Sequence, residues 1–123
     1  IVENTAKAFR CEGILEYKRF YPSLINDDDF TDYVKNIAID LLGEEKVIEL
    51  KNPSMGGEDF AFFLKEASGT FLSLNNLKAN QDGNIYPHHN SKFDVEENTF
   101  YIGSGILAEV SYRYLKEGKN EKL

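Results

Sequence analysis

Both histidines of the sequence stand side by side, as His88 and His89, within the stretch 86–94. A neutral imidazole is the commonest protein ligand for a transition metal, and such ligands usually lie in loops. The flanking residues favour a loop, because Pro87 fixes the backbone before the pair and Asn90 favours a turn after it. The stretch therefore predicts either a metal ligand or a solvated surface turn with two ordinary histidines.

A second stretch with chemical potential is Gly56-Gly57-Glu58-Asp59, which comes just before an expected helix. Backbone N–H groups at a helix N-terminus, exposed by adjacent glycines, can hold an anion such as a substrate carboxylate. The two acidic residues would partly neutralise that site, so an ordinary helix cap made of flexible residues is the alternative. We expect Glu58 to face a polar pocket and Asp59 to cap the helix.

Helices must position both stretches. Within residues 28–42, the apolar side chains from Phe30 onward fall at every position that an amphipathic helix requires. Asp28 or Asp29 is expected to cap this helix, and Gly43 is expected to stop it. A shorter helix is predicted from Glu58 to about Ala67, and a last one over about 97–116. Residues 1–10 resemble the end of a further helix.

Short strands are predicted at 14–21, 46–50 and 70–74, where β-branched, aromatic and alternating polar residues occur. Helices and strands thus alternate along the chain, which is typical of an α/β fold with helices packed on a small β-sheet. The polar segment that follows Pro22 is the best candidate for a domain boundary.

Composition limits the partners of this chain. The formal net charge of −7, without a basic cluster, argues against nucleic acid and anionic membranes. Apolar runs are far shorter than the roughly 20 residues of a bilayer span. No signal peptide is visible, and the single cysteine, Cys11, fits a reducing compartment, so a cytoplasmic location is expected. A first helix without a start signal suggests a piece of something longer.

Two sets of residues carry a family resemblance when they are taken together and in order. They are Met55-Gly56-Gly57-Glu58-Asp59-Phe60-Ala61, then Pro87, His89-Asn90, Lys92-Phe93-Asp94 and Ile102-Gly103. This pattern resembles the carboxy-terminal part of the M20 metallopeptidase/amidohydrolase family, in particular its N-acyl-amino-acid amidohydrolase, hippurate hydrolase-like branch. The resemblance covers about residues 1–116.

The resemblance implies a division of the chain. Residues 1–24 would be the end of a lid or dimerisation domain, with a helix and a strand. Residues 25–118 would be the carboxy-terminal part of a three-layer catalytic domain, and 119–123 a charged tail. Tyr21-Pro22, followed by Asn26-Asp27, resembles the return of the chain from lid to catalytic domain in that family.

The resemblance also implies roles for single residues. His89 would be a ligand of one of two divalent metal ions (Zn, Mn or Co), whereas His88 stands where the branch usually has leucine. Gly56, Gly57 and Glu58 would bind substrate or support the residues around the metals. The general base and the other ligands are expected upstream, so no catalytic residue is assigned within this chain.

The implied activity is hydrolysis of the amide bond of N-acyl amino acids or short peptides by a metal-activated water. The parent protein would be a homo-oligomer, and this piece alone would be inactive. The alternative is a non-catalytic α/β binding or oligomerisation domain. Such a domain would show the same periodicities but would not need His89.

Overall fold

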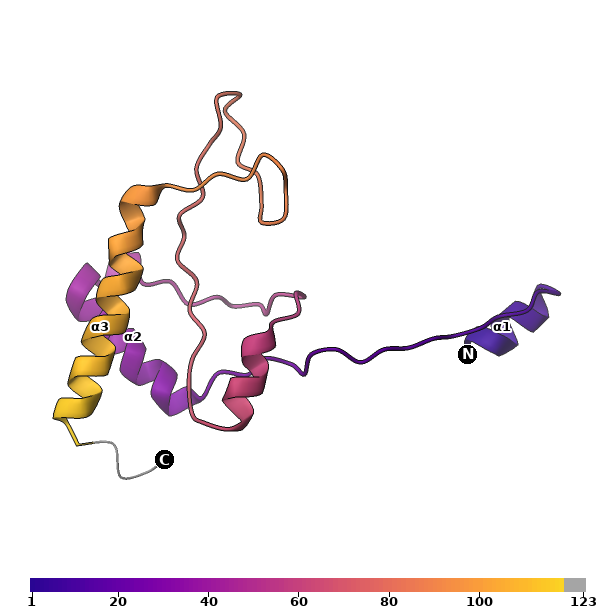
Figure 1. Cartoon of the computed structure of the whole chain (residues 1–123), viewed down its shortest axis with the longest axis horizontal. Helices are drawn as coiled ribbons and strands as arrows, with labels where there is room; N and C mark the ends of the chain where they lie inside the picture. Colours follow the sequence, from indigo (N-terminus) through magenta and orange to yellow (C-terminus); the bar gives the residue numbers. More distant parts are fainter. Residues whose placement is uncertain (119–123) are drawn as a thin grey trace.

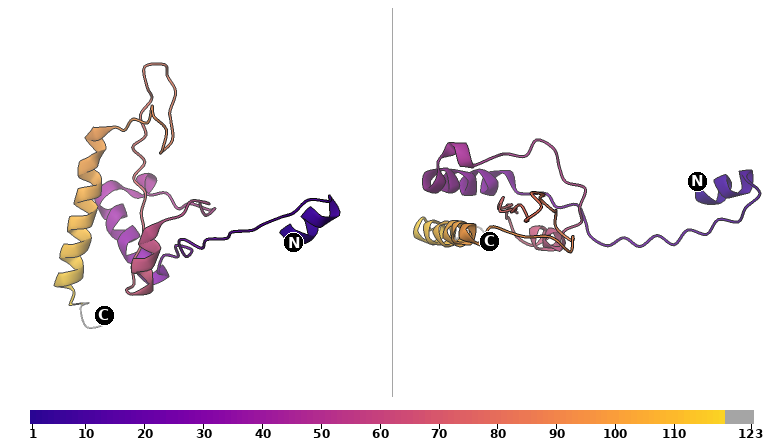
Figure 2. Two further views of the ribbon diagram at one scale, coloured as in Figure 1. Left: turned by 45° about the vertical axis from the view of Figure 1, so that its right-hand side comes forward. Right: turned by 90° about the horizontal axis from the view of Figure 1, so that it is seen from above.

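A computed structural model describes residues 1–118 of the chain. Its α-helices are α1 (Val2–Ala8), α2 (Asp28–Leu42) and α3 (Phe100–Lys116), and its 3-10 helices are Glu44–Lys46, Asp59–Lys65 and Glu97–Thr99. Helices α2 and α3 lie side by side, as Figure 1 and the view from above in Figure 2 show, whereas α1 stands far from them at the end of an extended arm. No helix of the described residues is long and apolar enough to cross a membrane.

Helix α2 confirms the helix predicted from the apolar periodicity. Its cap is Asp27, not the expected Asp28 or Asp29: Asp27 Oδ1 accepts a hydrogen bond from the backbone N–H of Phe30 at 2.8 Å. Such a cap satisfies one of the N–H groups that the first helical turn leaves without a partner. Gly43 ends the helix, as predicted, with a φ of 93° that a side chain would strain.

The core of the described chain lies on one face of α2. Val34, Ile37 and Ala38 are buried there, and Ala61 of the 3-10 helix Asp59–Lys65 is the other buried apolar residue. The rings of Phe30, Tyr33 and Tyr114 pack together across α2 and α3, with centroids 6.0 to 6.3 Å apart. Edge-on ring packing of this kind adds to the burial of apolar surface.

An ionic bridge fixes α3 against α2. The guanidinium of Arg113 on α3 donates from Nη1 to Asp40 Oδ2 at 2.6 Å and from Nε to Glu109 Oε1 at 2.7 Å. These two hydrogen bonds, with Asp40 contributing most, raise the pKa of Arg113 above its usual value. The bridge joins two segments that lie far apart in the sequence.

The predicted α/β fold is wrong for the described residues. Residues 1–118 contain no β-strand and no sheet, only the isolated antiparallel bridges Leu77–Val95 and Ala79–Ile85. The segments 14–21, 47–50 and 70–74 are extended or irregular, and Lys46 ends the 3-10 helix Glu44–Lys46. Many apolar side chains of these segments are exposed. A strand requires a neighbour that accepts its backbone hydrogen bonds, and no such neighbour pairs with these segments.

The amino-terminal arm keeps its helix but lacks its predicted strand. Helix α1 ends at Ala8, Phe9 is its C-cap, and the following residue, Arg10, has a left-handed φ of 57°. After it the chain turns back, so that Cys11 N donates to Ala6 O at 2.9 Å. Residues 14–20 then run alone toward α2 (Figure 1). The predicted tail 119–123 lies outside the described residues.

Candidate functional site

The histidine stretch lies on a long connection between the 3-10 helix Asp59–Lys65 and α3. The two outer segments of this connection meet at the bridge Leu77–Val95, where Lys78 N donates to Asp94 O at 3.3 Å. Within this frame, residues 79–85 form a tight hairpin in which Asn80 N donates to Asn84 O at 2.9 Å. The loop 86–93 therefore starts and ends beside this hairpin (Figure 1).

The loop turns sharply around Asn90, as the sequence predicts. Asn90 N donates to Pro87 O at 3.3 Å, and Phe93 N donates to Asn90 O at 3.0 Å. The Asn90 side chain accepts a further bond from Lys92 N at 2.9 Å. At the apex, His89 has a φ of 67°, in the left-handed region that non-glycine residues seldom adopt.

The two histidines have different surroundings. The His88 ring packs on Phe93, with centroids 4.7 Å apart and planes inclined by 34°. The His89 side chain is exposed, and within residues 1–118 it makes no hydrogen bond, ion pair or ring contact. Among the described residues, the two imidazoles thus differ in one contact: one face of the His88 ring packs on Phe93, whereas the His89 ring has no such neighbour.

Three side chains meet at the ends of this loop, and their contacts were not predicted from the sequence. Tyr86 Oη donates to Asp82 Oδ2 at 2.8 Å, and Lys92 Nζ lies 3.7 Å from the same carboxylate oxygen. The three residues meet because the hairpin 79–85 places Asp82 beside the two ends of the loop.

The glycine stretch is built around a helix cap. Glu58, not the expected Asp59, is the cap residue: its Oε1 accepts a hydrogen bond from Phe60 N at 3.2 Å. The following helix is a 3-10 helix that ends at Lys65. Gly57 lies against the ring of Tyr21, since a Cβ at this position would stand 3.1 Å from Tyr21 Cδ2. The Tyr21 ring also meets Phe62 edge-on at 6.1 Å.

The structure does not bring the two stretches into direct contact. Figure 1 shows the glycine stretch and the histidine loop as separate loops, and among residues 1–118 no hydrogen bond or ion pair joins them. The described part of the chain also holds no group of three His, Cys, Asp or Glu residues that could bind a metal ion. A metal centre needs about three protein ligands, so His89 offers one ligand and not a complete site.

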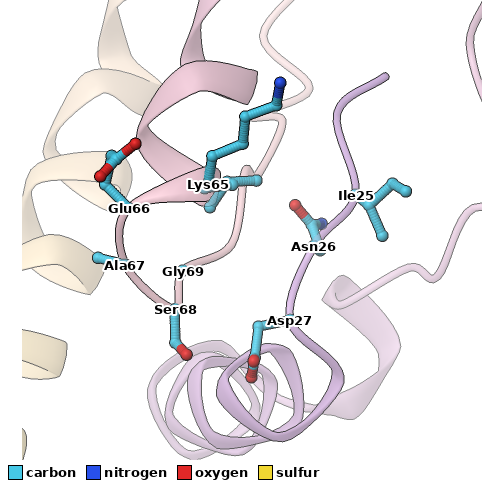
Figure 3. Close-up of a pocket in the computed structure, with 9 residues that line it drawn as sticks. Ile25, Asn26, Asp27, Lys65, Glu66, Ala67, Ser68 and Gly69 are labelled. Carbon is cyan, nitrogen blue, oxygen red and sulfur yellow. The ribbon is translucent and has the colours of Figure 1, made fainter. Parts of the chain in front are cut away.

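A cavity of about 490 Å³ lies elsewhere, between the start of α2 and the end of the 3-10 helix Asp59–Lys65. Figure 3 shows Asn26 and Asp27 on one side and Ser68 and Gly69 on the other. Asp27 N donates to Gly69 O at 3.0 Å, and the Asn26 amide both accepts from Phe71 N and donates to Phe71 O. These bonds tie two segments together, and the cavity contains none of the predicted site residues.

Comparison with known proteins gives consistent results. Residues 12–113 match the sequence profile of peptidase family M20/M25/M40. The chain is 33% identical over 127 residues to IAA-amino acid hydrolase ILR1-like 4 of Arabidopsis thaliana, covering 100% of this chain and 28% of that protein. It is 37% identical over 94 residues to Thermostable carboxypeptidase 1 of Saccharolobus solfataricus, covering 76% and 23%.

The chain thus spans about a quarter of the length of the curated relatives it matches. No solved structure matches it significantly.

Proposed function

Because this chain belongs to peptidase family M20/M25/M40, we propose that it forms part of a metal-dependent amidohydrolase that cleaves the amide bond of N-acyl amino acids or short peptides. The family is generally metal-dependent. One observation carries the proposal: the family match over residues 12–113 includes a loop whose apex holds His89, which is exposed and has no partner among residues 1–118. The names of the relatives, a hydrolase of an amino acid conjugate and a carboxypeptidase, support the substrate class.

His89 would be one ligand of one of two divalent ions (Zn, Mn or Co). Such an ion, when bound, polarises a carbonyl group and lowers the pKa of a bound water to about 7. The other ligands and the general base would come from outside this sequence, because its described residues hold no further ligand cluster. His88 is assigned no ligand role, because it stands at a position that the amidohydrolase branch usually fills with leucine or another residue; its ring packs on Phe93.

Gly56, Gly57 and Glu58 would contribute to substrate binding or support the residues around the metals. Gly56 has open space beside it, because a Cβ at this position would stand 3.8 Å from Ser54 Oγ and meet nothing closer, so a substrate could approach its backbone. Gly57 is closed on one side by Tyr21. Glu58 fixes the direction of the loop through its bond to Phe60 N.

The remaining proposals concern the whole protein. Residues 1–24 would be the end of a lid or dimerisation domain and residues 25–118 part of a catalytic domain, which agrees with the separation of α1 from the α2–α3 pair (Figure 2). The apolar side chains exposed along the arm, among them Phe9, Leu15 and Phe20, favour a homo-oligomer. The net charge of −7 disfavours binding to nucleic acid and anionic membranes, and the location would be cytoplasmic.

The test is an assay of the complete polypeptide that carries this sequence on a panel of N-acyl amino acids. Chelation should abolish turnover, and Zn, Mn or Co should restore it. No turnover on any member of the panel, with each metal restored, would contradict the proposal and favour a non-catalytic binding or oligomerisation role.

The 123-residue chain by itself should give no turnover, because its described residues hold no group of about three ligands and His89 alone is assigned as one. Chelator-sensitive hydrolysis by this chain would show that the rest of the site has been assigned to the wrong place.

A further inference from the structure

The two ends of the histidine loop are joined by side chains. Tyr86 stands directly before the loop and Lys92 near its end, and Lys92 Nζ donates to Tyr86 Oη at 3.4 Å. The same ammonium lies 5.2 Å from the centroid of the Tyr86 ring. Asp82 completes the group: its Oδ2 accepts from Tyr86 Oη at 2.8 Å and lies 3.7 Å from Lys92 Nζ. We name these three residues the loop clamp.

The loop clamp is itself anchored on the hairpin 79–85. Asp82 Oδ1 accepts a hydrogen bond from Asn84 N at 3.0 Å. The bonds from Asn84 and Tyr86 lower the pKa of Asp82, so the carboxylate stays charged opposite Lys92. From the other side, Asn80 Nδ2 donates to Lys92 O at 2.6 Å. The hairpin therefore fixes both the side chain and the backbone at the end of the loop.

The backbone at the loop apex needs such support. His89 has a φ of 67°, which costs free energy for a residue with a Cβ and persists only where the surroundings impose it. The bonds inside the loop involve Pro87, Asn90 and Phe93, and they fix the turn but not its orientation on the hairpin. The contacts of Tyr86 and Lys92 with Asp82 supply that orientation.

We propose that Asp82, Tyr86 and Lys92 are positioning residues, which hold the loop so that His89, and not His88, presents its imidazole to a divalent cation. This rests on the proposed role of His89 as a ligand. Each contact is solvent-exposed and weak alone, but the three share one carboxylate and one hydroxyl and so act together.

The test uses the isotopically labelled 123-residue chain and Co²⁺ alone as the probe, since imidazole is a good ligand for this ion. Two quantities are measured by NMR. The first is the Co²⁺ concentration that broadens the ring signals of each histidine. The second is the backbone φ of His89, read from one-bond and three-bond couplings.

In the unsubstituted chain, His89 should broaden at a lower Co²⁺ concentration than His88, and its couplings should report a positive φ. Tyr86→Phe removes the hydroxyl that links Asp82 to Lys92, and Asp82→Asn removes the shared charge. Each substitution should reduce the ratio between the Co²⁺ concentrations that broaden the two histidines by about threefold. This is the size expected when one exposed polar contact is lost. Lys92→Met should act likewise, and Lys92→Arg should retain the preference.

Tyr112→Phe is the matched control, because the Tyr112 ring, like that of Tyr86, lies beneath a lysine, with Lys116 Nζ 5.6 Å from its centroid. It should leave both quantities unchanged. The methyl signals of Val34, Ile37 and Ala38 report whether the core is intact.

The proposal is overturned if Tyr86→Phe and Asp82→Asn leave the preference and the φ of His89 unchanged, even though the ligand role of His89 would then stand. It is also overturned if Tyr112→Phe has the same effect or if the core signals shift together with the loop, because the effect would then not be local. A third outcome separates the two ideas: Co²⁺ shows no preference for His89 in the unsubstituted chain, but the backbone φ of His89 changes in Tyr86→Phe. The ligand role of His89 would then fail, while the effect of the loop clamp on the backbone would stand.

Discussion

The α2–α3 pair and the connection over residues 76–95 are held in different ways. In the pair, Val34, Ile37 and Ala38 are buried, and aromatic rings close the interface. In the connection, no residue is buried, and the chain is shaped by hydrogen bonds that stay in contact with solvent. Buried apolar surface is the main source of folding free energy, whereas an exposed hydrogen bond contributes little. The pair therefore stabilises the chain, and the connection sets local geometry around the histidines.

The largest effect on stability should follow from a cavity in the pair. Ile37, 2% exposed, is the most suitable target. Ile37→Ala should lower the free energy of unfolding by about 2–5 kcal/mol, the range for large-to-small substitutions in a core. Urea denaturation measures this loss. Ile48→Ala is the control, because Ile48 is 77% exposed and its substitution should change little. Equal losses would mean that the core does not lie between α2 and α3.

A smaller loss is expected at the start of α2. Asp27→Ala removes the side-chain acceptor for Phe30 N and should cost about 1 kcal/mol, the usual contribution of a helix cap. The comparison is Asp29→Ala, which lies in the first turn but caps nothing. Thermal or urea denaturation of both variants measures their losses of stability. A larger loss for Asp29→Ala would show that Asp27 is not the cap.

A still smaller effect should come from the ionic bridge between the helices. Asp40→Asn removes the charge that Arg113 contacts at 2.6 Å. Because the pair is exposed, the resulting loss of stability should be slight at low salt and should shrink as salt is added. Glu12→Gln, in the arm, serves as the comparison. A loss that salt does not change would show that Asp40 acts by packing or by neutral hydrogen bonding.

Protonation of Asp82 in the connection should loosen the loop and change the global stability least of all. The hydrogen bonds from Asn84 and Tyr86 lower the pKa of Asp82 relative to the unfolded chain. Its contribution is therefore complete above the ordinary aspartate pKa of about 3.9 and is lost as pH falls through the lower folded value. NMR titration of Tyr86 and Lys92 should show the loop loosening only in that acid range. Loosening near neutral pH would contradict the role of the Asp82 carboxylate.

The same contrast explains what could be predicted from the sequence. The apolar periodicity of residues 28–42 and the stop at Gly43 predicted α2 correctly, because a helix satisfies its own backbone bonds. The strands at 14–21, 46–50 and 70–74 were predicted wrongly. Alternating apolar and polar residues indicate that one face of a segment is apolar, but they do not show whether a neighbouring strand is present to pair with it.

The candidate site was predictable only in part. The loop around His89 was foreseen from Pro87 and Asn90, whereas the cap was assigned to Asp59 instead of Glu58, since neighbouring acidic residues suit the same helix start. The contacts among Asp82, Tyr86 and Lys92 could not be predicted, because they depend on the hairpin and not on a spacing visible in the sequence.

The central claim is that His89 is a metal ligand of the proposed hydrolase and that His88 is not. The most direct measurement compares His89→Ala with His88→Ala in the complete polypeptide, by bound metal content and by turnover of an N-acyl amino acid. The account predicts that His89→Ala lowers both, with turnover falling by several orders of magnitude, while His88→Ala changes them much less, because only the first removes a ligand. Equal effects of the two substitutions, or a larger effect of His88→Ala, would contradict it.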